Sequence, residues 1–177
     1  MMCTGFPFRI RRKGGRELAQ ALDKYAACTS RKDQIHLLIV GSPENEFLDT
    51  LPFPYTSLGH VSVDELWTAY HAADVFLSTS LYDAGPMMIS ESMLAGTPVV
   101  SFPTGLATDL IEDGVSGFLA AEKTADSFAN ALSELDRVSD LSSFREMAQA
   151  RATNIHAPSK VAQALLELID SMQAQPN

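Results

Sequence analysis

The sequence predicts a doubly wound α/β domain, in which about six parallel strands form one sheet with helices on both faces. Short runs rich in Val, Ile and Leu alternate with helical patterns over the first 120 residues. These runs are continuously apolar, as expected for parallel strands that are buried on both faces. A chain of 177 residues, of which 46% are hydrophobic, can bury one core, so we expect a single domain over 1–177.

The predicted elements alternate along the chain. A strand near Cys3 is followed by a helix over 15–26, whose Leu18, Leu22 and Tyr25 form one apolar stripe. The other predicted strands are 34–40, 57–61, 74–80, 98–102 and 117–120. Further helices are predicted over 63–73 and 85–95, and after residue 120 only helices are predicted, over 124–136, 141–152 and 158–173. The apolar stripe of the last helix either closes the sheet or contacts a neighbour, including a second copy of the chain.

Charge and composition exclude several classes of protein. The net charge of −9 argues against nucleic acid as a partner, because phosphate backbones attract basic faces. No run reaches the ~18 apolar residues of a membrane span, and residues 9–13 are charged where a signal peptide would be apolar. We therefore expect a cytoplasmic protein, peripheral to a membrane at most. The two cysteines, Cys3 and Cys28, form no CxxC pair and indicate neither disulfides nor zinc.

A local basic cluster contrasts with the acidic remainder of the chain. Five of the thirteen basic residues lie between positions 9 and 16, whereas the other eight are set against 22 acidic residues. A basic spot on an acidic protein suits a small anion such as a phosphate, and a solvated basic turn is the alternative. The cluster consists of Arg9, Arg11, Arg12, Lys13 and Arg16.

The loops that follow the strands are the candidate ligand sites. In doubly wound sheets, ligands bind beyond the carboxyl ends of the strands, where the strand order reverses. These loops are 41–44, 61–64, 79–86 and 102–105, and the first begins with Gly41, a candidate binding residue. No G-x-G-x-x-G follows a strand and no G-x-x-x-x-G-K-[ST] occurs, which weakens the dinucleotide and P-loop interpretations.

The stretch "YDAGPMMISE" (82–91) predicts a helix start at the end of a strand. Pro86 is the expected first helical residue and Gly85 the flanking cap. The free N–H groups of Met87 and Met88 then point toward the crevice, with the positive end of the helix dipole behind them. Because Gly85 has no side chain, a diphosphate could approach the backbone at this anion site.

Two acids flank this helix start. Glu91 lies on a largely apolar helix face, so its carboxylate needs partners, either the backbone of a neighbouring loop or a pair of hydroxyls such as those of a ribose. Asp83 precedes the helix and either forms an ordinary Asx turn or faces the same crevice.

Four segments resemble glycosyltransferase family 4, whose members are two-domain GT-B enzymes that transfer a sugar from a nucleotide donor. The segment "STSLYDAGPMMISESMLAGTPVVSF" (78–102) resembles the family signature, with Asp83 and Glu91 at the spacing of its two acids. "DLIEDGVSGFLA" (109–120), "LGHVSVDELWTAYHAADVFL" (58–77) and "RKGG" (12–15) resemble the segments around it. The resemblance covers nearly the whole chain and implies the C-terminal, donor-binding half of a GT-B enzyme.

The resemblance also implies a role for each matching residue. Glu91 would hold the ribose, Asp83 a hydroxyl of the donor sugar, and Lys13 the diphosphate. The remaining implied donor contacts are the backbone around Gly85, Met87 and Met88, with Pro86 between them, and the base-side loop of Gly59, His60 and Val61. The expected donor is a UDP- or GDP-sugar.

This chain departs from the family pattern at three places. The first acid is Asp83 where the family usually has Glu, and Ala84-Gly85-Pro86 replaces the common Gly-Phe-Gly. The Arg that often lies five positions before the Lys is Phe8 here, and Arg9 or Arg11 would take its place, with Arg9 a catalytic candidate beside Lys13.

The chain lacks an Asp-x-Asp motif for a metal, so we expect Lys13 and the helix start to stabilise the leaving diphosphate. The resemblance implies a retaining, metal-independent transfer with no cofactor. It also implies that a missing N-terminal domain holds the acceptor and that this chain alone is inactive. A non-catalytic nucleotide-sugar binding module or an inactive fragment is the alternative, and a related GT-B epimerase is a more distant one.

Overall fold

The protein folds around one six-stranded parallel sheet. The computed structural model describes residues 1–5, 10–43 and 45–173. The strand order is β3-β2-β1-β4-β5-β6, so the chain direction across the sheet reverses between β1 and β4. The strands are β1 (Met2–Gly5), β2 (Leu37–Val40), β3 (Tyr55–Gly59), β4 (Val75–Ser78), β5 (Val99–Ser101) and β6 (Gly117–Leu119). The predicted doubly wound α/β fold is confirmed.

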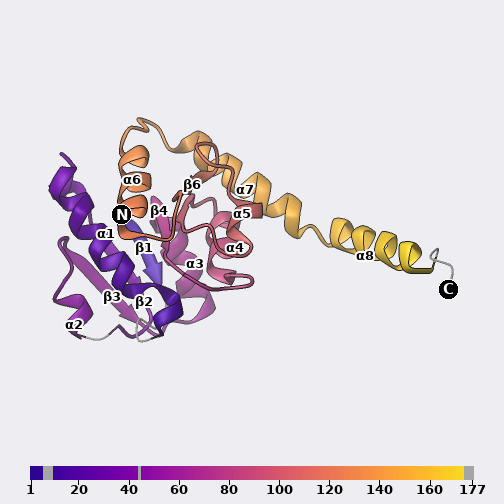
Figure 1. Cartoon of the computed structure of the whole chain (residues 1–177), viewed down its shortest axis with the longest axis horizontal. Coiled ribbons are helices and arrows are strands. Elements are labelled where there is room, and N and C mark those ends of the chain that lie inside the picture. Colours follow the sequence, from indigo (N-terminus) through magenta and orange to yellow (C-terminus); the bar gives the residue numbers. More distant parts are fainter. Residues whose placement is uncertain (6–9, 44, 174–177) are drawn as a thin grey trace.

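Helices cover both faces of this sheet (Figure 1). One face packs against α1 and α6 and the other against α3, α4 and α7. The α-helices are α1 (Gly15–Cys28), α2 (Asn45–Leu48), α3 (Val63–Ala72), α4 (Met87–Leu94), α5 (Ala107–Leu110), α6 (Ala125–Asp136), α7 (Ser142–His156) and α8 (Pro158–Gln173). Short 3₁₀ turns lie at Arg11–Lys13 and Lys32–Gln34.

Successive residues of the central strands face opposite cores. Leu37 and Ile39 of β2 pack with α1 and α6, whereas Leu38 and Val40 pack on the α3 and α4 side. Both sets are buried, and this is the physical reason that the strands read as continuous apolar runs.

The boundaries of some elements differ from the prediction. The strand predicted over 34–40 begins at Leu37, because 32–34 forms a 3₁₀ turn. The strand predicted over 57–61 lies at Tyr55–Gly59, on the edge of the sheet. Because residues 55–58 of this edge strand are exposed, a run of apolar residues does not mark where the strand begins. Gly59 has a φ of 66°, which ends the strand before His60.

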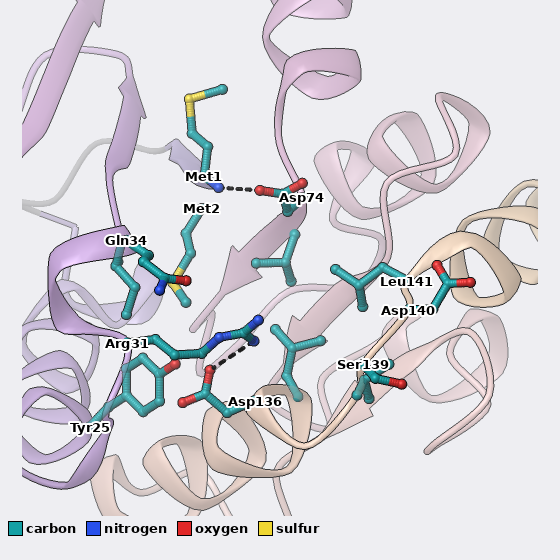
Figure 2. Close-up of a pocket in the computed structure, with 14 residues that line it drawn as sticks. Met1, Met2, Tyr25, Arg31, Gln34, Asp74, Asp136, Ser139, Asp140 and Leu141 are labelled. Carbon is teal, nitrogen blue, oxygen red and sulfur yellow. Dashed lines mark hydrogen bonds and ion pairs between the residues drawn. The ribbon is translucent and has the colours of Figure 1, made fainter.

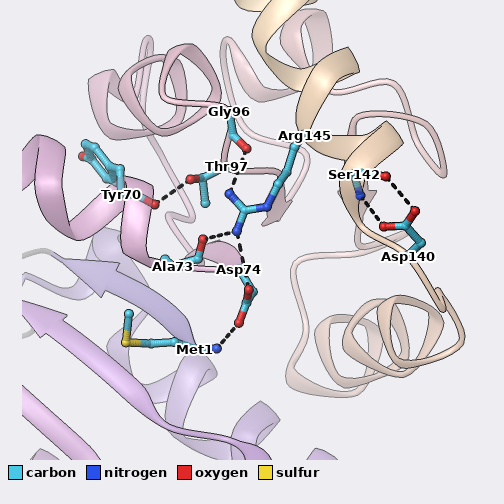
Figure 3. A network of polar contacts seen from close by, with 9 residues as sticks. All are labelled: Met1, Tyr70, Ala73, Asp74, Gly96, Thr97, Asp140, Ser142 and Arg145. Carbon is cyan, nitrogen blue, oxygen red and sulfur yellow. Dashed lines mark hydrogen bonds and ion pairs between the residues drawn. The ribbon is translucent and has the colours of Figure 1, made fainter.

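Helix α7 is anchored to the body of the domain by Arg145 (Figure 3). Its guanidinium donates hydrogen bonds to the carbonyl oxygens of Ala73 (2.6 Å) and Gly96 (3.4 Å) and lies 3.4 Å from Asp74. Ala73 follows α3 and Gly96 follows α4, so one side chain of α7 joins the ends of both helices.

Helix α8 extends away from the rest of the molecule (Figure 1). It contacts α7, and all its residues from Pro158 to Met172 are exposed. Its large apolar side chains, 40–69% exposed, are Val161, Leu165, Leu166, Leu168, Ile169 and Met172. Among the described residues, no helix has the length and apolarity to cross a membrane.

Candidate functional site

Two adjoining cavities lie beyond the carboxyl ends of β1, β2 and β4, at the point where the strand order reverses. The β4 cavity has a volume of about 340 Å³ and the β2 cavity about 370 Å³, and both are lined by Gly5 and Met88. The β4 cavity is also lined by Arg12, Lys13, Phe76, Ser78, Ser80, Asp83, Gly85, Pro86 and Met87. The β2 cavity is also lined by Val40, Gly41, Ser42, Gly59, His60, Val61 and Leu66.

The basic turn before α1 is held against the loop after β4. Leu81 donates its backbone N–H to the carbonyl of Arg12 at 2.7 Å. Gly14 has a φ of 72°, and a Cβ there would lie only 1.8 Å from the carbonyl oxygen of Thr79, so only glycine allows this approach. The turn therefore places Lys13 beside the end of β4.

Lys13 and Asp83 meet in the β4 cavity. The Lys13 ammonium donates to Asp83 Oδ2 at 2.6 Å, and the Arg12 guanidinium lies 3.6 Å from the same oxygen. Asp83 Oδ1 accepts the backbone N–H of Gly85 at 3.3 Å, so the carboxylate both forms the Asx-type contact and faces the crevice. Burial raises the pKa of Asp83, but Lys13, the Gly85 amide and Arg12 together bring it below its usual value.

Helix α4 begins at Met87, one residue later than predicted. Pro86 has a ψ of 97°, which lies outside the helical region, so Pro86 is the cap and the prediction that it is the first helical residue is wrong. Its carbonyl accepts the N–H of Ile89 at 3.0 Å. Met87 and Met88, whose N–H groups belong to the first turn of the helix, both line the β4 cavity.

Glu91 is half-buried and accepts a hydrogen bond from a side chain that the sequence did not indicate. The Tyr70 hydroxyl of α3 donates to Glu91 Oε2 at 3.0 Å. Among the described residues, no neighbouring loop offers its backbone to this carboxylate. Glu91 lies one helical turn beyond Met88 and does not itself line either cavity.

The β2 cavity brings together three further predicted residues. Gly41, His60 and Val61 all line it, and the Gly41 N–H donates to the carbonyl of Gly59 at 2.7 Å. This contact joins the loops after β2 and β3. The cavity wall is largely apolar, with Val61, Leu66 and Met88 as its larger side chains.

The two arginine candidates have different outcomes. Arg9 lies outside the described residues. Arg11 forms an ion pair with Glu17 at 2.8 Å and is 67% exposed, so it turns toward α1. Arg12, a member of the basic cluster that was not among the catalytic candidates, is the arginine beside Asp83.

Ser78 and Ser80 were not predicted as site residues. They lie on the same face of the β4 end as Phe76 and line the β4 cavity, although each is only 5–6% exposed. Their backbone carbonyls are held by neighbouring elements: that of Ser78 accepts the N–H of Phe102 at 3.0 Å, and that of Ser80 accepts the Thr104 hydroxyl at 2.7 Å. The change from apolar to polar residues in "VFLSTS" (75–80) was the available signal.

A third cavity, of about 340 Å³, lies at the opposite ends of the strands (Figure 2). Its charged groups already have partners: Arg31 lies 3.7 Å from Asp136, Asp74 forms an ion pair with the Met1 amino group, and Asp140 accepts hydrogen bonds from Ser142. Its position beside the starts of β1 and β4 separates it from the ligand crevice.

Comparison with known proteins assigns the family. Residues 2–137 match the family described as glycosyl transferases group 1. The chain belongs to this family. Its structural neighbours are GT-B glycosyltransferases.

Individual group 1 relatives are longer than this chain. The GDP-mannose-dependent alpha-mannosyltransferase of Corynebacterium glutamicum is 29% identical over 117 residues, covering 66% of this chain and 27% of that protein. An uncharacterized glycosyltransferase of Methanocaldococcus jannaschii is 37% identical over 89 residues, covering 50% of this chain and 22% of that protein. The structure of Anabaena HepE in complex with UDP has a TM-score of 0.73 at 24% identity, over 96% of this chain and 48% of that one. The chain thus spans about half or less of the proteins it matches.

Proposed function

We propose that this chain is the donor-binding, C-terminal half of a family 4 glycosyltransferase and binds a UDP- or GDP-sugar. The observation that carries the proposal is that Lys13, Asp83 and the start of α4 line one cavity where the strand order reverses. Support also comes from relatives, since one is named as GDP-mannose-dependent and a fold neighbour holds UDP.

In this proposal the donor lies along both cavities. The diphosphate binds the free N–H groups of Met87 and Met88, beside the Lys13 ammonium. Ser78 and Ser80 line the same cavity, and their hydroxyls supply further hydrogen bonds to the donor.

Asp83 contacts a hydroxyl of the donor sugar and Glu91 the ribose. The base lies in the β2 cavity, against the loops of Gly41, His60 and Val61, where the apolar wall suits the face of a planar ring.

The transfer needs stabilisation of the negative charge that develops on the leaving diphosphate. Lys13 and the N-terminus of α4 are preorganised positive groups at that position. We propose that they replace a metal ion and that the reaction retains the configuration at the anomeric carbon.

The acceptor would be held by a second domain. We propose that the other half of the enzyme supplies it, since the matched relatives and fold neighbours extend well beyond the aligned region. The chain by itself would bind the donor without transferring the sugar.

Calorimetric titration of the purified chain tests donor binding. UDP, GDP, UDP-glucose and GDP-mannose are the probes, and one base should bind more tightly than the other. Glu91→Ala should weaken nucleotide binding by one to a few kcal/mol, about fivefold or more in affinity, as expected for the loss of a charged hydrogen-bonding group.

The matched control is Glu146→Ala, which removes an exposed glutamate from α7, on a different helix. It should leave the affinity unchanged. No binding of any probe, or an unchanged affinity in a folded Glu91→Ala variant, would contradict the proposal.

A further inference from the structure

The contact between Tyr70 and Glu91 ties the proposed ribose contact to the core of the domain. The Tyr70 side chain is fully buried, and its ring meets Phe76 of β4 edge to face, with the ring centroids 5.7 Å apart. Trp67 packs against it from the preceding turn of α3, at 6.3 Å. The ring is therefore held from the sheet and from its own helix.

The backbone of Tyr70 is held as well (Figure 3). Thr97, which follows α4, donates its hydroxyl to the Tyr70 carbonyl at 2.6 Å. This bond joins the segment after α4 to α3, so the phenol oxygen and the helix that carries Glu91 keep a defined separation.

The phenol is the donor in the contact with Glu91. Burial raises the pKa of Tyr70, and the charge of Glu91 and the hydrogen bond to it raise it further, so the hydroxyl stays protonated at neutral pH. Glu91 Oε2 accepts this hydrogen bond, and the other oxygen, Oε1, has no hydrogen-bond partner among the described residues.

We infer that Tyr70 is a positioning residue that holds the Glu91 carboxylate in the orientation needed to receive the ribose hydroxyls of the donor. The inference rests on the proposed function. A free glutamate side chain loses much rotational freedom when it binds a ligand, and fixing it beforehand removes that cost. Tyr70 itself, fully buried, does not touch the ligand.

Tyr70→Phe tests this, because it deletes one oxygen and keeps the ring packing. UDP and GDP are titrated by calorimetry beside 2′-deoxy-UDP and 2′-deoxy-GDP. Tyr70→Phe should lower the affinity for the ribonucleotide by about threefold to tenfold and the affinity for the deoxynucleotide much less. In a Glu91→Ala background, Tyr70→Phe should cause no further loss, because the group it positions is absent.

Two further variants make the result specific. Tyr55→Phe removes a hydroxyl from a tyrosine that is 42% exposed on edge strand β3, and should change nothing. Glu91→Asp keeps the charge but withdraws the carboxylate by one methylene from Tyr70, and should reduce the preference for ribose as Tyr70→Phe does.

The outcomes separate this inference from the proposed function. Two results would overturn the role of Tyr70 while leaving donor binding intact. One is that Tyr70→Phe lowers the affinity for ribo- and deoxynucleotides equally, and the other is that it still lowers the affinity in the Glu91→Ala background. If the wild-type chain binds none of the nucleotides, the proposed function and this inference both fail.

Discussion

Lys13 and Asp83 are 70 positions apart in the chain, yet their side chains are 2.6 Å apart in the fold. Both residues had been selected from the sequence, but for separate contacts with a ligand. Their ion pair means that Asp83 is held in place before any donor arrives, and that a sugar hydroxyl would have to share its carboxylate with Lys13.

The ion pair predicts a pH dependence of stability. Because the folded pKa of Asp83 lies below its usual value of about 3.9, the ionised group stabilises the fold above that pH and loses this effect as the pH falls through the folded pKa. The difference in unfolding free energy between wild type and Asp83→Asn should therefore be constant near neutral pH and shrink below about pH 4. Urea unfolding at a series of pH values measures it.

Asp23→Asn is the control for this series, since Asp23 is exposed on α1. The unfolding free energy of Asp23→Asn should differ little from that of wild type at every pH. If the difference in unfolding free energy between wild type and Asp83→Asn stays constant down to pH 2.5, the charge of Asp83 contributes nothing to stability.

At the scale of elements, α4 is positioned from both ends. Its start lies at the β4 cavity, and α7 packs along it, with Arg145 bonded to the carbonyl of Gly96 just past its C-terminus. Helical periodicity in the sequence predicted both helices, but it carries no information about which helix packs on which.

Arg145→Met should therefore lower the free energy of unfolding by about 2 kcal/mol, because it removes charged hydrogen bonds to two carbonyl groups while keeping an apolar side chain. Urea unfolding measures this difference, provided that the slope of unfolding free energy against urea concentration is the same in both proteins. Arg137→Met, at an ion pair with Glu134 where the arginine is 73% exposed, should change stability by less than about 1 kcal/mol. Equal effects of the two substitutions would show that the Arg145 contacts do not anchor α7.

At the scale of the whole molecule, α8 is the helix whose large apolar side chains are exposed, although it contacts α7. Its apolar residues recur at helical spacing and stay exposed, unlike those of α1 or α6, which face the sheet. A stripe of this kind marks an interaction surface.

For the isolated chain we predict self-association through α8. Sedimentation velocity should detect a larger species whose fraction rises with protein concentration. Leu165→Glu combined with Ile169→Glu should shift the chain to a monomer, because both side chains lie on the exposed stripe. Gln163→Glu is the control, because it adds a negative charge on the polar side of α8, away from the apolar stripe. It should leave the association in place. A wild-type chain that sediments as a monomer at all concentrations would contradict this prediction.

By itself, the sequence determined the fold class, the parallel sheet and, to within one residue, the place of the helix start after β4. Continuous apolar runs and the Gly-Pro step are local signals with local physical causes. It also indicated Gly41, Val61 and Asp83, because the loops after parallel strands meet at one edge of the sheet. The family resemblance added Lys13 and His60.

Only the tertiary structure decided which of these side chains touch. The pair of Lys13 with Asp83, the contact of Tyr70 with Glu91 and the cavity that Ser78 and Ser80 line depend on elements that are distant in the chain. The one-residue shift at Pro86 follows from a backbone angle that the residue type does not specify. The displacement of edge strand β3 follows from the exposure of its residues, which the sequence pattern does not reveal. Spacing along a chain specifies a face of a helix or strand, whereas a contact requires the packing of two such faces.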